Sequence, residues 1–258
     1  MTKPKIVIVG AGNVASHIAP ALFFAGAGDI VQVCSRSLKS ASALTSRIPG
    51  AVAAGSLDEI VKDADIYLIS VADDAIASVV ESLPRTGALV LHTSGSVGME
   101  ALAGASERYG VFYPLQTFSK GVELDVAEVP LFIEGSTPQV EDEIRRFASV
   151  LFKSVYHADS ETRKKMHVAA VFACNFTNYL WTLAAELLAK DNLPFDVLRP
   201  LLEETLRKAM VNTPGASQTG PAARGDRRIV DAHLALLDGR EKEIYSLLSE
   251  CIMERRKG

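Results

Sequence analysis

The pattern of hydrophobic and polar positions divides the chain into two parts. Up to residue 157, short apolar and β-branched runs alternate with longer amphipathic segments, which predicts strands alternating with helices. Strands that are apolar on both faces and separated by helices are typical of a parallel sheet with helices on both sides. We therefore predict an α/β fold with a doubly wound Rossmann-type sheet. Its strands are expected at residues 5–9, 30–34, 51–54, 65–71, 88–92, 110–115, 129–134 and 154–156.

The pattern changes after residue 157, where only helical periodicity remains. This change predicts two domains, a nucleotide-binding domain at residues 1–157 and an all-helical domain at residues 158–258. Helices are expected at residues 159–189, 196–210, 227–237 and 240–256, with a loop rich in Gly, Pro and Ser at residues 212–226.

Residues 168–189 are mostly apolar and long enough to span a bilayer. Five of these residues are polar or charged, which is costly in lipid. They are Asn175, Thr177, Asn178, Thr182 and Glu186. We therefore expect a helix that is buried within protein, and no membrane partner.

Charge and cysteine content narrow the function classes. The net charge of -4 gives no electrostatic basis for binding nucleic acid or an anionic membrane. Cys34, Cys174 and Cys251 lie in apolar runs without a C-x-x-C spacing, which predicts buried thiols in a reducing cytoplasm. The sequence shows no metal-ligand spacing, and no secretion signal precedes the first strand.

A glycine-rich turn of the form G-x-G-x-x-A follows the first predicted strand and leads into a helix. Gly10 permits a tight turn, Gly12 lets the main chain approach a pyrophosphate, and the small Ala15 allows close packing of helix and strand. The phosphates would then contact free N–H groups at the helix start, near Asn13 and Val14. The pattern predicts dinucleotide binding, with a βαβ unit that only resembles such a site as the alternative.

The end of the second strand indicates which dinucleotide is bound. An acidic residue there would hydrogen-bond the ribose 2′-OH of NAD, but this chain has Ser35, Arg36 and Ser37. A guanidinium and two hydroxyls suit a 2′-phosphate, in a pocket expected to be free of carboxylates. We therefore predict NADP as the cofactor. The alternative is that Arg36 is a solvated loop residue.

The carboxyl ends of later strands are the next candidates, because ligands bind at these ends in open α/β sheets. Val71, Ala72 and Asp73 are expected beside the nicotinamide ribose, unless Asp73 caps the following helix. Ser94 lies in a polar turn that is expected near the substrate, unless the turn only satisfies its own backbone. Residues 113–118 form either a substrate wall or a rigid connection.

The long apolar helix carries a polar stripe that contains His167, Asn175 and Asn178. At 100° per residue these share one broad face, where buried polar groups must be paired or meet a ligand. His167 is a candidate proton donor to a carbonyl or imine, or else a hydrogen-bonded core histidine. Arg224 either binds an anionic substrate or pairs with Asp226.

Segments of both parts resemble a known family. Residues 10–15, 34–37 and 70–76 resemble the N-terminal domain of the deazaflavin-dependent NADP oxidoreductase family, in the superfamily of pyrroline-5-carboxylate reductase and 6-phosphogluconate dehydrogenase. Residues 92–95, 113–118, 167–178 and 219–226 resemble a narrower group of Rossmann-like proteins with a helical C-terminal domain of unknown function.

This resemblance implies a homodimer formed through the helical domain, with the site in the cleft between the domains. It does not imply deazaflavin use. Related β-hydroxyacid dehydrogenases carry a helical lysine followed by asparagine one turn later. Here Lys164 and Lys165 precede His167, and neither is followed by asparagine at that spacing.

Together these features predict a cytoplasmic oxidoreductase that transfers a hydride between NADP(H) and a small carbonyl or imine compound. The substrate would be held by Ser94, His167 and Asn175. The alternative is a non-catalytic NADP-binding sensor or scaffold dimer.

Overall fold

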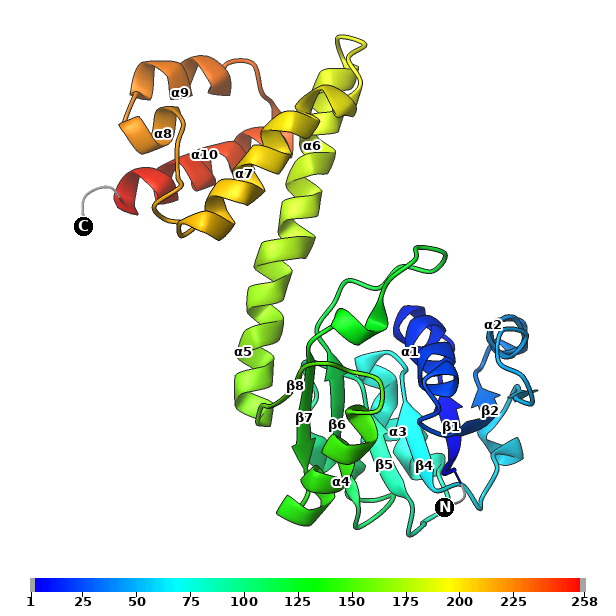
Figure 1. Ribbon diagram of the computed structural model, residues 1–258. Helices are drawn as coiled ribbons and strands as arrows, with labels where there is room; N and C mark the ends of the chain where they lie inside the picture. Colours follow the sequence, from blue (N-terminus) through cyan, green and yellow to red (C-terminus); the bar gives the residue numbers. More distant parts are fainter. Residues whose placement is uncertain (1–2, 256–258) are drawn as a thin grey trace. The chain divides into compact units, whose positions relative to one another are not determined.

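The structure, a computed structural model, describes residues 3–255 (Figure 1). It contains two compact units, Met1–Cys174 and Asn175–Gly258, which are described separately below. The division falls inside a long helix that begins at Ser160. The predicted domain boundary between residues 157 and 158 stays a prediction.

The first unit is built on an eight-stranded sheet in the order β3-β2-β1-β4-β5-β6-β7-β8 (Figure 1). Every strand predicted from the sequence is present. Their bounds are Lys5–Val9 (β1), Asp29–Cys34 (β2), Val52–Ala54 (β3), Ile66–Ile69 (β4), Leu89–His92 (β5), Tyr109–Pro114 (β6), Leu131–Gly135 (β7) and Val155–His157 (β8).

The sheet is parallel except where β6 pairs with β7, which is antiparallel. This one antiparallel pair departs from the parallel sheet that the strand pattern predicted. A parallel neighbour requires a long crossover, usually a helix, whereas β6 and β7 are joined by a loop with one 3₁₀ turn, η4 (Val126–Glu128).

Helices cover both faces of the sheet, as the prediction of a doubly wound fold requires. One apolar layer joins the sheet to α1 (Asn13–Phe24), α2 (Leu38–Thr45) and α4 (Pro138–Ala148). The other layer joins it to α3 (Ile76–Ser82) and to η3 (Met99–Leu102). Because both faces are covered, successive residues of a strand are all buried, which explains the continuous apolar runs.

Between β3 and β4 the chain forms only one 3₁₀ turn, η1 (Leu57–Glu59). The Ser56 hydroxyl caps this turn by accepting a hydrogen bond from the Asp58 backbone N–H. The helix ends at once because Ile60 has extended backbone angles.

The long helix consists of α5 (Ser160–Ala170), a π-helical turn, η5 (Val171–Phe176), and α6 (Thr177–Ala189). Asp159 caps α5 by accepting a hydrogen bond from the Thr162 N–H at 2.7 Å, which lowers the pKa of Asp159. The π turn interrupts the regular 100° spacing on which the shared face of His167 and Asn175 was predicted.

Helices are the only regular secondary structure among the described residues of the second unit, as predicted. A short helix, α8, lies within the predicted loop: Pro221 occupies its first turn and Gly225 ends it in the left-handed conformation. The predicted end of the last helix, residue 256, lies outside the described residues. Besides α6, the elements are η6 (Phe195–Leu198), α7 (Arg199–Val211), α8 (Pro221–Arg224), α9 (Arg227–Leu234) and α10 (Gly239–Arg255).

Two burial expectations are wrong for the single chain. The long helix Ser160–Ala189 was expected to be buried within protein, yet its most apolar stretch is not buried within the chain. By length and composition alone this helix could cross a membrane. Cys34 is buried, whereas Cys174 and Cys251 are exposed. An apolar run is buried only where other elements pack against it, and the run alone does not supply those elements.

Candidate functional site

The glycine turn after β1 forms an open cradle at the start of α1. Gly10 has a φ of +110°, and a Cβ there would lie 2.1 Å from the Ser70 carbonyl oxygen, so only glycine fits. Gly12 is the N-cap residue of α1, and no side chain caps the helix start. The first N–H groups of α1 therefore remain available to an anionic ligand.

A pocket of about 820 Å³ extends from this turn along the carboxyl ends of several strands. Ser37 is not among its lining residues; its hydroxyl instead caps α2 by accepting from the Ser40 N–H at 3.2 Å. The other residues predicted to bind the cofactor all line the pocket: Gly10, Gly12, Asn13, Val14, Ser35, Arg36, Val71, Ala72 and Asp73.

The end of the pocket beside β2 carries the predicted phosphate-binding groups. Arg36 is exposed and makes no hydrogen bond or ion pair with any residue from 3 to 255. We expected a pocket without carboxylates, but the Asp58 side chain also lines it. The sequence did not reveal this neighbour, since pairing of β2 with β3 brings Ser56 against Cys34, whose thiol donates to the Ser56 carbonyl oxygen at 3.3 Å.

Asp73 follows β4 and lines the pocket, where its carboxylate accepts a hydrogen bond from the Ser96 hydroxyl. The alternative of a helix cap does not hold, because the 3₁₀ turn η2 (Asp73–Ala75) begins at Ala72 without a side-chain cap. The contact instead joins the end of β4 to the turn after β5.

Ser94 stabilises that turn and also faces the pocket. Its hydroxyl oxygen accepts from the backbone N–H groups of Ser96 at 3.1 Å and Val97 at 3.0 Å. Ser94 thus satisfies the turn and also lines the pocket, and its position beside a substrate stays a prediction.

His92 fixes the position of the Ser94 backbone. Its Nδ1 accepts from the Ser94 N–H at 3.1 Å, so Nε2 carries the hydrogen and faces the Gly98 carbonyl oxygen at 3.4 Å. The ring is fully buried, and burial together with the nearby Arg163 guanidinium lowers the pKa of His92 to about 4. His92 is thus neutral at physiological pH and serves the turn's structure.

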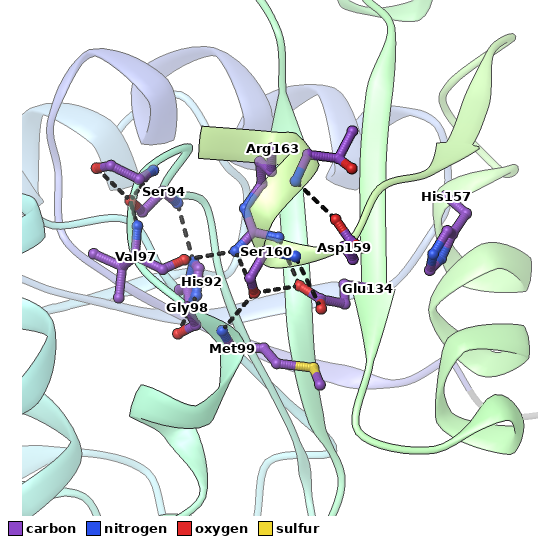
Figure 2. A network of polar contacts seen from close by, with 12 residues as sticks. His92, Ser94, Val97, Gly98, Met99, Glu134, His157, Asp159, Ser160 and Arg163 are labelled. Atoms are coloured by element: carbon purple, nitrogen blue, oxygen red, sulfur yellow. Dashed lines mark hydrogen bonds and ion pairs between the residues drawn. The ribbon is translucent and has the colours of Figure 1, made fainter. Parts of the chain in front are cut away.

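A buried ion pair fixes the base of α5 to this region (Figure 2). Arg163 is fully buried and donates to the Glu134 carboxylate of β7 at 2.7 Å and to the Val97 carbonyl oxygen at 2.6 Å. Ser160 donates its hydroxyl to the same carboxylate at 2.7 Å. The network joins α5, β7 and the turn after β5. Arg163 Nε is the one buried side-chain nitrogen or oxygen without a hydrogen-bond partner among the described residues.

One turn beyond Arg163, α5 brings His167 to the pocket wall. His167 Nδ1 lies 3.0 Å from the Tyr113 hydroxyl at the end of β6, and both residues line the pocket. Gly95 makes room for this pair, because a Cβ there would lie 2.7 Å from both His167 Nδ1 and Tyr113 Cζ. His167 is therefore a half-buried pocket residue with a polar partner, and not a core histidine.

Other candidates lie elsewhere. Asn175 is exposed and begins the second unit, and its catalytic role stays a prediction. Asp226 caps α9 by accepting from the Ile229 N–H at 3.2 Å. Lys165 pairs with Glu161 on the exposed side of α5. Among residues 3–255 no group of three His, Cys, Asp or Glu side chains is arranged to hold a metal.

Sequence reasoning missed the hydrogen-bonding role of Tyr113 and the Glu134–Arg163 pair. Tyr113 could have been found by the rule that singled out Ser94, since both lie at the carboxyl end of a strand. Glu134 left a weaker signal, an acid in an otherwise apolar strand. Arg163 left none, because its partner is 29 residues away in the sequence.

Comparison with known proteins agrees with this geometry. Residues 5–94 match the family described as NADP oxidoreductase coenzyme F420-dependent, and residues 129–252 match the domain of unknown function DUF2520. A solved structure from Bacteroides fragilis, described as an NADP oxidoreductase, is 44% identical, covers 98% of each chain and has a TM-score of 0.90. The chain belongs to this family of NADP oxidoreductases.

More distant structures share the fold of this NADP oxidoreductase. Protein TM1727 from Thermotoga maritima is 22% identical over 98% of each chain, with a TM-score of 0.71. A reductive aminase from Aspergillus terreus, in complex with NADPH and ethyl levulinate, is 17% identical over 100% of this chain and 95% of its own, with a TM-score of 0.73. Comparison with curated protein sequences gives no match.

NADP is the cofactor of the family, and the residues present fit it. The cradle at Gly10 and Gly12 and the uncapped start of α1 suit a pyrophosphate. Arg36, without an intramolecular partner in the described chain, suits a 2′-phosphate.

Proposed function

We propose that this oxidoreductase transfers a hydride between NADP(H) and a small carbonyl or imine compound. The observation that carries the proposal is that a single pocket is lined both by the glycine cradle and by Ser94, Tyr113 and His167. Two fold relatives, the reductive aminase noted above and an imine reductase from Myxococcus stipitatus in complex with NADP⁺, act in the same class of chemistry by name, which supports the choice of substrate class.

Different residues along the pocket bind the cofactor, orient the substrate and supply the proton. When bound, NADPH supplies the hydride. The backbone N–H groups at the start of α1 and the Arg36 guanidinium hold the phosphates, Ser94 orients the substrate, and His167 is the source of the proton that the reduced carbonyl or imine requires.

The first test is whether the protein oxidises NADPH with a panel of aldehydes, ketones and preformed imines, followed by absorbance at 340 nm. We expect turnover with at least one class. Measurements with ketone alone and with ketone plus an amine separate carbonyl reduction from imine reduction. Tight NADPH binding without any turnover would instead support the alternative of a non-catalytic NADP-binding sensor or scaffold.

Arg36→Ala tests the cofactor assignment. Loss of a charge-assisted contact to the 2′-phosphate is expected to weaken NADPH by about 10- to 100-fold while NADH affinity hardly changes. Isothermal titration calorimetry measures both affinities. Arg85→Ala is the matched control, since Arg85 is also exposed but does not line the pocket. Equal weakening of the two dinucleotides would remove Arg36 as the phosphate ligand.

His167→Gln tests the proton source. We expect kcat to fall by about 100-fold or more while the Kd for NADPH is retained. His157→Gln is the control, because His157 is exposed and pairs with Glu141 away from the pocket. An unchanged kcat in His167→Gln would contradict the assignment.

We also propose that the protein is a cytoplasmic homodimer that buries the helical unit's apolar surface. Large apolar side chains of this unit are exposed in the single chain, including Leu201 and Leu206, each 62% exposed. Patches of this kind mark interfaces in soluble proteins. Light scattering coupled to size exclusion should give the mass of two chains. A monomer that binds lipid vesicles would contradict the proposal.

A further inference from the structure

The Tyr113 hydroxyl has a special position in the pocket. Tyr113 is at the end of β6, its side chain is 8% exposed, and its only hydrogen-bond partner among the described residues is His167 Nδ1, at 3.0 Å. The two rings meet edge to face with their centroids 6.1 Å apart. A buried hydroxyl that contacts an imidazole on one side and a ligand pocket on the other is placed to pass a proton between them.

The fold keeps space for this contact. Gly95 follows Ser94 in the turn after β5, and any side chain there would collide with both Tyr113 and His167. His167 itself is carried by α5, whose base is held by the buried Arg163–Glu134 pair. Three separate elements thus converge on one hydrogen bond, and His167 retains partial access to solvent.

We propose that Tyr113 is the residue that hands the proton to the substrate, and that His167 resupplies it. This inference rests on the proposed function and deepens it by defining the proton's route. The C=O or C=N double bond accepts a hydride at carbon and breaks its π bond toward oxygen or nitrogen. That atom takes the proton of the Tyr113 hydroxyl, the phenolate takes the Nδ1 proton of a His167 imidazolium, and the neutral imidazole then regains one proton from solvent.

The other polar groups in this part of the pocket are less suited to the role. The Ser94 oxygen is occupied by two backbone N–H groups, and the Asp73 carboxylate by the Ser96 hydroxyl. His92 is fully buried and faces the Gly98 carbonyl oxygen.

The electrostatic surroundings keep Tyr113 protonated at neutral pH. Burial raises the pKa of Tyr113, the nearby Arg163 guanidinium opposes this rise, and the Asp73 carboxylate adds to it. The titratable groups that face the phenol are therefore Arg163, Asp73 and His167, from α5 and the end of β4. A protonated phenol can donate, whereas a phenolate could not.

The main variant is Tyr113→Phe, which keeps the ring and removes only the hydroxyl. With a substrate found in the panel, we expect kcat to fall by about 100-fold or more, with little change in KM or in the Kd for NADPH. Tyr109→Phe is the matched control on the same strand, since Tyr109 does not line the pocket. The double variant with His167→Gln should be no slower than the worse single variant, because a relay fails as a unit.

A second readout does not depend on activity. The ¹⁵N resonance of His167 Nδ1 should move in Tyr113→Phe protein without cofactor, while that of His157 stays in place. Gly95→Ala should move the same His167 resonance by forcing the rings apart, and should lower kcat while the protein stays folded.

The outcomes separate this inference from the proposed function. If wild-type protein turns over no compound of the panel, the proposed function fails, whatever the NMR signal does. If wild-type protein is active and Tyr113→Phe retains its kcat while His167→Gln does not, the proton passes directly from His167 and the role of Tyr113 is refuted. An unmoved His167 resonance in Tyr113→Phe would refute the contact itself.

Discussion

The two compact units bury very different shares of their side chains. In the first, every residue of β4 and β5 is buried and two apolar layers enclose the sheet. In the second, the buried residues among those described are Ala222, Val230 and Ser249. The first unit therefore carries its own core, whereas many large apolar side chains of the second unit are exposed in the single chain.

Two ion pairs, one from each unit, differ in the same way. In the first unit Arg163 and Glu134 form an ion pair inside the core. In the second, Glu204 pairs with Arg207 at 2.7 Å on the surface. Removing one partner of a buried pair leaves an uncompensated charge, whereas solvent takes over for an exposed one.

The largest effect is expected from Arg163→Met, which leaves the Glu134 carboxylate buried without its cation. The free energy of unfolding should fall by about 3–5 kcal/mol, measured by urea denaturation. Glu204→Gln, the matched change in the second unit, should cause no measurable change in the urea midpoint. Similar losses in the two units would mean that burial does not distinguish these pairs.

His92 should give the first unit a pH-dependent stability. Its pKa is about 4 in the folded chain against an ordinary 6.5, so between these values the unfolded state binds a proton that the folded state does not. Stability should therefore fall as pH falls from 6.5 to 4, by up to about 3 kcal/mol at the lower end. Urea titrations of wild type and His92→Asn should differ in this window. His233→Gln, in the exposed second unit, should retain the wild-type slope.

Substitution of glycine by alanine should also have different effects on stability in the two units. Gly10→Ala combines a positive φ with a clash against the Ser70 carbonyl oxygen, and should cost about 2–3 kcal/mol of stability as well as NADPH binding. Gly215→Ala, in open space in the second unit, should stay within about 0.5 kcal/mol of wild type. Gly12→Ala separates the two effects: its Cβ would make only an ordinary van der Waals contact, 3.9 Å from the Ser70 carbonyl oxygen, so the variant should lose NADPH affinity while its thermal midpoint is retained.

The smallest expected effect concerns the reactivity of the three cysteine thiols, and its test needs no substitution. Cys34 is buried and burial raises the pKa of its thiol, whereas Cys174 and Cys251 are exposed. A disulfide reagent such as Ellman's should therefore modify two thiols rapidly and the third only on unfolding. Slow modification of Cys174 in a dilution-sensitive manner would show that a second copy covers this part of the helix.

Most of the fold was predictable because each strand and helix is specified by a short, continuous stretch of sequence. Apolar runs marked all eight strands, and the turn at Gly10 and Gly12 marked the nucleotide end of the pocket. The direction of β7 and the exposure of Cys174 were not predictable, since both depend on what packs beside them. In the site, Ser94 and His167 were singled out by their residue type and position. Tyr113 was not assigned a partner, because its partner is 54 residues away.

Neighbouring residues alone specify the strand–turn–helix order, the absence of a side chain at Gly10 and the position of Arg36 after the second strand. The packing of distant elements brings Arg163 to Glu134, and it brings Tyr113 to His167 across the space left by Gly95. Those contacts join strand ends and a helix that are distant in the chain. A hydrogen bond depends on positions within a fraction of an ångström, and only the packed fold sets them.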